Sequence, residues 1–165
     1  MHNLQFVPEC YAETELVKLI FDNIDYLNHG EGIHSVSTIL RKQDVQNYIN
    51  IGFIDNDKKN VPPYFDEFKV IGEHLSVIFK KHPNTNDYIF VANPAMEIFI
   101  LSQLSEINKQ PSDYDLPNDF KEFRKKLKSM RIQHNEKYKE MIGDLKKAKT
   151  SGISFMLNKI SELQN

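Results

Sequence analysis

A short apolar segment that ends in two aspartates constrains this chain more than any other part of the sequence. Its apolar side chains are Ile49, Ile51, Phe53 and Ile54. Side chains that are β-branched or aromatic favour a strand buried in a sheet. The apolar run stops at Asp55, and Asp57 follows two residues later. Because functional groups collect at the carboxyl ends of strands in parallel sheets, this segment predicts a site at the end of a buried strand.

Two interpretations of Asp55 and Asp57 are open at this point. In extended chain, a spacing of two residues places both carboxylates on one face, where they repel each other unless a cation lies between them. Oxygen ligands of this kind suit Mg²⁺ or Mn²⁺. The sequence Asp-Asn-Asp-Lys-Lys-Asn is equally typical of a polar turn, which needs no metal.

Length and composition indicate one globular domain. The chain has 165 residues, of which 40% are hydrophobic and 27% are charged. Its longest apolar runs, such as 98–101, are far too short to span a membrane, so we expect no membrane partner. The amino-terminal residues lack the pattern of a secretory signal. The single cysteine, Cys10, excludes an intrachain disulfide and fits a reducing, cytoplasmic location.

The apolar spacing predicts an α/β fold, with a mainly parallel sheet, helices on both faces and a helical C-terminal extension. The expected strands are 4–9, 49–55, 75–80 and 88–92. The expected helices are 12–27, 36–48 and 95–106, followed by helical segments over 119–147 and a last helix over 153–163. Segment 65–75 is interpreted as a short helix or an irregular crossover. The loop chemistry of 82–87 permits a hairpin between the two strands that flank it.

Positive charge is concentrated in the C-terminal part of the chain. Residues 119–149 contain eleven lysines and arginines against five acidic residues, so this segment carries +6 and the remainder −8. A basic arm beside an acidic site is one arrangement that binds nucleic acid, with phosphates along the arm. The candidate phosphate contacts are Arg124, Lys125, Lys128 and Arg131. A solvated helix face explains the same pattern without any ligand.

Three expected strands end in residues of functional type: Glu9, then Asp55 and Asp57, then Asn93-Pro94 with Glu97 one turn later. At these positions the chain resembles the Toprim domain of topoisomerases, primases and old-type nucleases, and it is most similar to the small RloB-like branch. The matching motifs are Phe6-Val7-Pro8-Glu9 with Thr14-Glu15-Leu16, then Phe53-Ile54-Asp55-Asn56-Asp57-Lys58, then Ala92-Asn93-Pro94-Ala95-Met96-Glu97. The resemblance covers roughly residues 4–104. Cys10 stands where the family usually has glycine, a residue that lets the backbone approach a ligand closely.

The resemblance implies a Rossmann-like Toprim domain over 1–107. Pro111 and Pro117 indicate a linker over 108–118, and we expect a basic helical extension over 119–165, packed on the same domain. The resemblance also implies a Mg²⁺-dependent (or Mn²⁺-dependent) nuclease or phosphodiester-transfer protein, of a kind found in bacterial defence. Glu9, Asp55 and Asp57 would be the metal ligands and catalytic residues, with Glu9 also as general acid or base. Asn93 and Glu97 would support the ligands, and Lys58 would contact phosphate.

Other interpretations of these residues stay open. Glu9 can be a strand-end acid that caps the next helix, and Glu97, like Glu13 and Glu15, suits the positive end of a helix whatever its function. Lys58 fits an exposed turn equally well. Cys10 is expected to be a small buried apolar side chain. The six histidines show no metal-ligand spacing and are left unassigned.

Two other functions fit the same sequence. Haloacid-dehalogenase-like phosphatases also place Asp-x-Asp after an apolar strand, although they require Thr or Val where this chain has Lys59 and need a late acidic pair. A catalytically weak Toprim-like module, whose tail binds a partner such as an ATPase, is the second. Stabilisation by Mg²⁺ would separate an enzyme from such a module.

Overall fold

The computed structural model describes residues 3–22, 24–42, 48–56 and 59–164, which form an α/β fold around one six-stranded sheet. The order of the strands is β2-β1-β3-β6-β5-β4. The four parallel strands are β1 (Asn3–Pro8), β2 (Tyr26–Leu27), β3 (Tyr48–Asp55) and β6 (Asp87–Ala92). The antiparallel pairs involve β5 (Val77–Lys81) and β4 (Lys69–His74). The predicted mainly parallel sheet and the β5–β6 hairpin are therefore confirmed.

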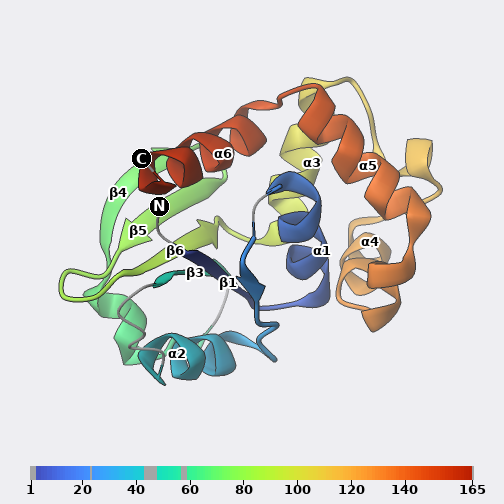
Figure 1. Ribbon diagram of the computed structural model, residues 1–165. Helices are drawn as coiled ribbons and strands as arrows, with labels where there is room; N and C mark the ends of the chain where they lie inside the picture. Colours follow the sequence, from blue (N-terminus) through green and yellow to red (C-terminus); the bar gives the residue numbers. More distant parts are fainter. Residues whose placement is uncertain (1–2, 23, 43–47, 57–58, 165) are drawn as a thin grey trace.

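Helices cover both faces of this sheet, as the sequence predicts (Figure 1). One face packs against α2 (Ile33–Lys42) and the short 3₁₀ helix η1 (Pro63–Glu67). Gly52, in the middle of β3, lets α2 approach the sheet closely. A Cβ atom there would lie 3.0 Å from Ile89 Cγ2 and 3.2 Å from Leu40 Cδ1, which is tighter than ordinary packing.

The other face carries α1 (Tyr11–Ile20), α3 (Met96–Glu106), α5 (Glu136–Lys147) and α6 (Ser151–Gln164). Apolar residues of the two C-terminal helices belong to the same buried cluster as Leu4 and Phe6 of β1. Tyr138 of α5 is fully buried, and its hydroxyl donates to the carbonyl of Ala12 in α1 at 2.8 Å. The C-terminal helices thus complete the core of the sheet domain.

Local caps divide the helical region predicted over 119–147. The helix α4 (Phe120–Leu127) begins where the Asp119 side chain accepts the N–H of Glu122 at 2.9 Å. A 3₁₀ helix, η3 (Met130–His134), follows. The helix α5 then begins where the Asn135 side chain accepts the N–H of Tyr138 at 3.0 Å. Side-chain oxygens at these positions satisfy backbone donors that a helix start leaves free.

The segment predicted as a linker, 108–118, lies packed against α5. It contains the 3₁₀ helix η2 (Pro111–Tyr114), and the side chains of Tyr114 and Leu116 are both buried. The Tyr114 hydroxyl donates to Asp144 of α5 at 2.9 Å. Among the helices formed by the described residues, none combines the length and apolarity needed to cross a membrane.

Two helices differ from their predicted bounds. The helix expected over 12–27 ends at Ile20, and the chain turns extended at Phe21. The side chain of Asp25 then accepts the N–H of Leu4 at 2.7 Å, next to the pairing of β2 with β1. Pairing of β2 with β1 therefore takes the place of the last helical turns that the sequence predicted.

The helix expected over 36–48 spans Ile33–Lys42, and Tyr48 already belongs to β3. Residues 43–47, also part of that prediction, lie outside the described residues. The helix begins earlier than predicted because the side chain of Ile33 is buried against the same sheet face as Val36 and Leu40.

Segment 65–75 contains a strand that the sequence did not predict. The 3₁₀ helix η1 reaches only to Glu67, and β4 occupies most of the segment that was expected to be a short helix or an irregular crossover. Val70 and Ile71 of β4 are 56% and 47% exposed, so the strand buries neither face completely. It forms through backbone pairing with β5, and this pairing leaves no alternating pattern in the sequence.

Candidate active site

Glu9 and Asp55 lie together at the carboxyl ends of two neighbouring parallel strands. Pro8 is paired with Phe53, so Glu9 follows β1 at the level where β3 ends in Asp55. The backbone N–H of Glu9 donates to Phe53 O at 2.9 Å, and the N–H of Asp55 donates to Glu9 Oε2 at 3.2 Å. Both side chains are buried, with 6% and 4% exposure. The expectation that these two carboxylates converge agrees with this geometry, whereas Asp57 and Lys58 lie outside the described residues.

The end of β3 is also joined to the start of α3. Asp55 Oδ1 accepts the N–H of Met96, the first residue of α3, at 2.8 Å. Asn56 Nδ2 donates to Asn93 Oδ1 at 3.0 Å, and the N–H of Asn56 donates to the carbonyls of Ala92 and Pro94. Asn93 thus holds the loop that follows the Asp55 strand. The helix start places a favourable positive potential beside the Asp55 carboxylate.

Glu13 is a third carboxyl group at this end of the sheet. Its side chain is fully buried, and Oε2 accepts the N–H of Cys10 at 2.8 Å. Oε1 has no hydrogen-bond partner among the residues that the structure describes. Burial raises the pKa of the Glu13 carboxyl well above its ordinary value, and the nearby carboxylates of Asp55 and Glu9 raise it further. A neutral Glu13, or a cation shared by the cluster, relieves this repulsion.

Sequence reasoning gave Glu13 only a role at the positive end of a helix. One signal was present, because Glu13 is the third residue of a helix that begins directly after a strand-end acid. A glutamate at that position can accept a hydrogen bond from the backbone N–H of the residue before the helix, which places its carboxyl group close to the end of the strand.

Glu97 binds two of the cations that the sequence assigned to nucleic acid. Its side chain lies in the first turn of α3 and is almost fully buried. Arg124 Nε lies 3.1 Å from Glu97 Oε1, within ion-pair range but without the alignment of a hydrogen bond, and Lys128 Nζ lies 3.9 Å from the same oxygen. The side chains of Arg124 and Lys128 remain 42% and 40% exposed to solvent.

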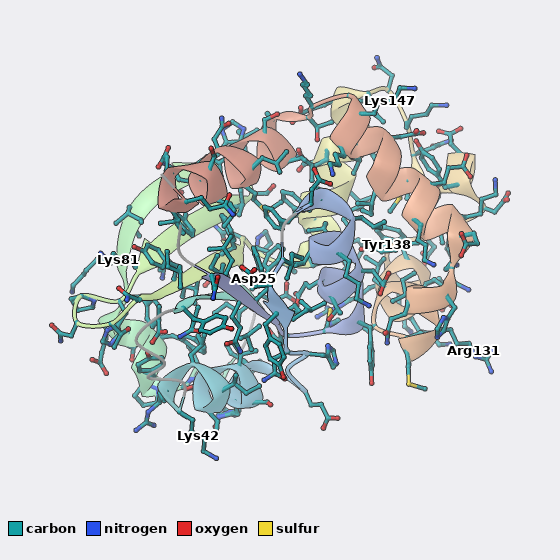
Figure 2. All side chains as sticks on the ribbon, in the orientation of Figure 1. Asp25, Lys42, Lys81, Arg131, Tyr138 and Lys147 are labelled. Atoms are coloured by element: carbon teal, nitrogen blue, oxygen red, sulfur yellow. The ribbon has the colours of Figure 1, made fainter. Side chains whose placement is uncertain are left out.

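The other two candidate phosphate contacts lie farther out. Lys125 is 79% exposed and lies 4.0 Å from Glu122 on its own helix. Arg131, on η3, points away from the sheet at the edge of the helical part (Figure 2). Among the contacts that the structure shows, none joins Lys125 or Arg131 to the carboxylate cluster, and both side chains face solvent.

A cleft of about 370 Å³ opens beside the carboxylates. It is lined by Glu9, Cys10, Tyr11, His29, Glu31, Gly32, Asp55 and Lys128. The Cys10 thiol has a pKa well above its ordinary value, first because it is buried and then because Glu13 is near, so it is a neutral side chain rather than a nucleophile. Gly32 adopts a φ of +92°, a conformation that favours glycine, and its N–H donates to the carbonyl of Glu9 at 3.2 Å.

The donors at this end of the sheet suit a hard cation, although they do not form a complete metal centre by themselves. In the part of the chain that the structure describes, no group of three His, Cys, Asp or Glu side chains is placed to hold a metal ion. Glu9 and Asp55 supply carboxylate oxygens, and the unpartnered Oε1 of Glu13 is buried beside them. Oxygen ligands of this kind fit Mg²⁺ or Mn²⁺.

Comparison with protein-family models, with curated proteins and with solved structures gave no match. The geometry of the cleft is therefore the basis for any functional conclusion.

Proposed function

We propose that this chain is a Mg²⁺- or Mn²⁺-dependent enzyme of Toprim type that cleaves or transfers phosphodiester bonds in nucleic acid. The observation that carries the proposal is the close approach of two buried carboxylates, Glu9 and Asp55, at the ends of adjacent parallel strands. The backbone N–H of Asp55 donates to Glu9 Oε2 at 3.2 Å. Buried like charges are costly, so a cation at this point would stabilise the folded chain.

Glu9, Asp55 and Asp57 would hold the metal, whose chemistry is to neutralise a phosphodiester and orient the attacking group. Two of the protein's own cations, Lys128 and Arg124, are paired with Glu97. Of these two, Lys128 lines the same cleft as Glu9 and Asp55. These two side chains would contact the non-bridging oxygens of the same phosphate, while Lys125 and Arg131 would contact phosphates farther along the strand.

The first experiment measures metal binding without any substrate. Thermal unfolding of the wild type should shift upward with Mg²⁺ or Mn²⁺ because the ion binds the folded state. E9Q and D55N should lose this shift, whereas D66N, at an exposed acid on η1, should keep it. An equal shift in all four proteins would place the metal elsewhere and remove the support for the proposal.

The second experiment measures cleavage of labelled single- and double-stranded DNA and RNA with Mg²⁺, with Mn²⁺ or with a chelator. Activity should require metal and should disappear in D55N.

Binding to nucleic acid should also weaken steeply as salt rises. The slope of log affinity against log salt concentration should become shallower by about one for each of Arg124, Lys125, Lys128 and Arg131 that is replaced by alanine. Binding that ignores salt would leave these residues as a solvated helix face.

One observation favours the second candidate, an interaction module with little catalytic activity. Phe120 and Met130, beside the basic residues of α4 and η3, are 44% and 63% exposed. Exposed apolar side chains among cations suit a protein partner such as an ATPase. A chain that binds no metal in the unfolding experiment and cleaves none of the four substrates would favour this function.

A further inference from the structure

His29 lies in a loop that is tied to the end of β1. The N–H of Asn28 donates to Phe6 O at 2.9 Å, and the N–H of Gly30 donates to Pro8 O at 2.8 Å. These two bonds flank His29 and hold its ring over the first turn of α1, in the same cleft as Glu9 and Asp55. The sequence offered no reason to select this residue, because its partners are distant in the chain.

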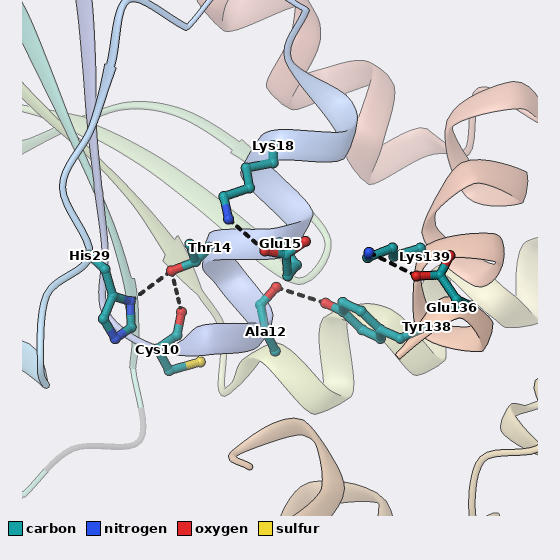
Figure 3. Close-up of polar contacts among 9 residues, drawn as sticks. All are labelled: Cys10, Ala12, Thr14, Glu15, Lys18, His29, Glu136, Tyr138 and Lys139. Carbon is teal, nitrogen blue, oxygen red and sulfur yellow. Dashed lines mark hydrogen bonds and ion pairs between the residues drawn. The ribbon is translucent and has the colours of Figure 1, made fainter. Parts of the chain in front are cut away.

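The hydrogen bonds of Thr14 determine which ring nitrogen of His29 carries the proton. Thr14 Oγ1 lies 2.8 Å from the carbonyl oxygen of Cys10 and 2.8 Å from His29 Nδ1 (Figure 3). A hydroxyl has one proton, and a carbonyl oxygen can only accept, so that proton belongs to the Cys10 bond. His29 Nδ1 must therefore donate to Thr14. In the neutral ring, Nε2 is then left with a free lone pair.

The ring is also fixed in orientation and kept neutral. It stacks on the Tyr11 ring with the centroids 4.4 Å apart and the planes 18° apart. Burial lowers the pKa of His29 below its ordinary value; Glu31 opposes this effect, and Lys18 adds to it. The titratable and charged groups around the ring are Tyr11 and Lys18 on α1, Glu31 in the loop, and Glu9, Cys10, Asp55 and Lys128 along the cleft.

We propose that His29 Nε2 is the general base of this cleft and takes the proton from the water that attacks the phosphodiester. The inference rests on the proposed function and assigns one of its steps. The water oxygen forms a bond to phosphorus, the bond from phosphorus to the leaving oxygen breaks, and one water proton moves to Nε2. The leaving oxygen takes a proton from solvent. Glu9, which accepts the Asp55 N–H and would hold the metal, is not required for this proton transfer.

The first test reads the tautomer directly, without substrate or metal. The imidazole ¹⁵N resonances of the wild type should show Nδ1 protonated and Nε2 unprotonated at pH 7, with the signals of His29 assigned by their absence from H29N. T14V removes the oxygen that accepts from Nδ1, so the Nε2-protonated tautomer should gain population in that variant. A wild-type His29 with its proton on Nε2 would overturn the proposal.

The second test measures single-turnover cleavage at saturating metal. H29N keeps a side-chain N–H for Thr14 but has no basic nitrogen at the Nε2 position, and the rate should fall about 100-fold or more. Added imidazole should restore part of the rate in H29A. H34N, at an exposed histidine on α2, should cleave like the wild type. The metal-dependent shift in thermal unfolding should remain in H29N.

These outcomes separate the two proposals. Full activity in H29N, together with loss of activity in D55N, would overturn the role of His29 and leave the proposed function intact. A loss of metal-dependent stabilisation in H29N would make His29 part of the metal site instead of the base. A wild type that cleaves none of the substrates would overturn both.

Discussion

Two buried aspartates on neighbouring strands have opposite surroundings. Asp55 ends β3 and is 4% exposed, whereas Asp87 begins β6 and is 3% exposed. Asp87 accepts from neutral donors: Asn50 Nδ2 and Thr85 Oγ1 donate at 2.8 Å, and the Tyr64 hydroxyl donates to the same carboxylate. Burial raises the pKa of Tyr64, and hydrogen bonding to Asp87 raises it further, so its hydroxyl remains a donor.

Asp55, in contrast, accepts from the backbone N–H of Met96 and has the carboxyl groups of Glu9 and Glu13 as near neighbours. The network around Asp87 stabilises the fold, because neutral donors satisfy a buried charge. The cluster around Asp55 brings like charges together, which costs free energy in the absence of a cation. Burial of an acidic side chain therefore does not show by itself whether the residue is structural or functional. The distinction depends on whether its neighbours are neutral donors or other acids.

The largest expected effect separates the two aspartates by activity. D55N should abolish metal-dependent cleavage, because it removes charge that the metal needs while Oδ1 can still accept from Met96. Its free energy of unfolding without metal should be unchanged or slightly higher, since repulsion within the cluster falls. Cleavage assays and urea unfolding measure the two quantities. An unfolded D55N would show that Asp55 is structural, like Asp87.

The next effect is one of stability. D87A leaves Asn50, Tyr64 and Thr85 without their shared acceptor, and we expect a loss of about 3 kcal/mol in the free energy of unfolding. Y64F, which removes one donor and leaves the carboxylate, should cost roughly 1 kcal/mol. Urea unfolding provides both values. Near wild-type stability in D87A would mean that the Asp87 network contributes little and that the contrast with Asp55 is false.

A smaller effect on the free energy of unfolding tests whether the ion pair between Arg124 and the buried Glu97 stabilises the fold. Arg124 and Lys125 are adjacent in α4, but Arg124 pairs with buried Glu97 and Lys125 faces solvent. R124A should lower stability by about 1–2 kcal/mol, because it weakens the pairing of a buried carboxylate whose partner is half exposed. K125A should change stability by less than about 0.5 kcal/mol. Equal effects of the two substitutions in urea unfolding would contradict the role of Glu97.

The smallest expected effect is a change in how stability depends on pH. The pKa of Glu13 is raised in the folded state, so the folded chain holds a proton that the unfolded chain releases above the ordinary value of 4.5. The contribution of Glu13 to stability should therefore be greatest below that value and should decline as pH rises through the raised pKa of the folded state.

E13Q should remove this decline, and saturating Mg²⁺ should reduce it in the wild type. E136Q, at an exposed glutamate on α5, should keep it. Urea unfolding across the pH series, with and without metal, measures the effect. The same dependence of stability on pH in the wild type and in E13Q would show that Glu13 is not held neutral.

Much of the fold follows from local sequence. The apolar runs of β1, β3 and β6 predict buried strands, and their order with the helices predicts parallel pairing. Parallel pairing then brings Glu9 and Asp55 to one edge, because adjacent parallel strands end together. The apolar spacing also predicts α3 and α6 within a few residues, because each buries a stripe of its own side chains against the sheet.

Other features were decided by contacts between residues far apart in the chain. The strand β4 exists because β5 pairs with it, and α1 ends early because the following chain pairs with β1. The tautomer of His29 depends on Thr14, fifteen residues away, and the cations of α4 face Glu97 because the C-terminal helices pack on the sheet domain.

The sequence by itself thus determined the α/β class, the main strands and the edge at which two acids meet, because periodicity and strand order are local properties. Only the tertiary structure decided what surrounds each charge. The pairing of Glu97 with Arg124 and the burial of Glu13 arise from packing between elements, and no local pattern encodes the distance between two side chains that meet only after folding.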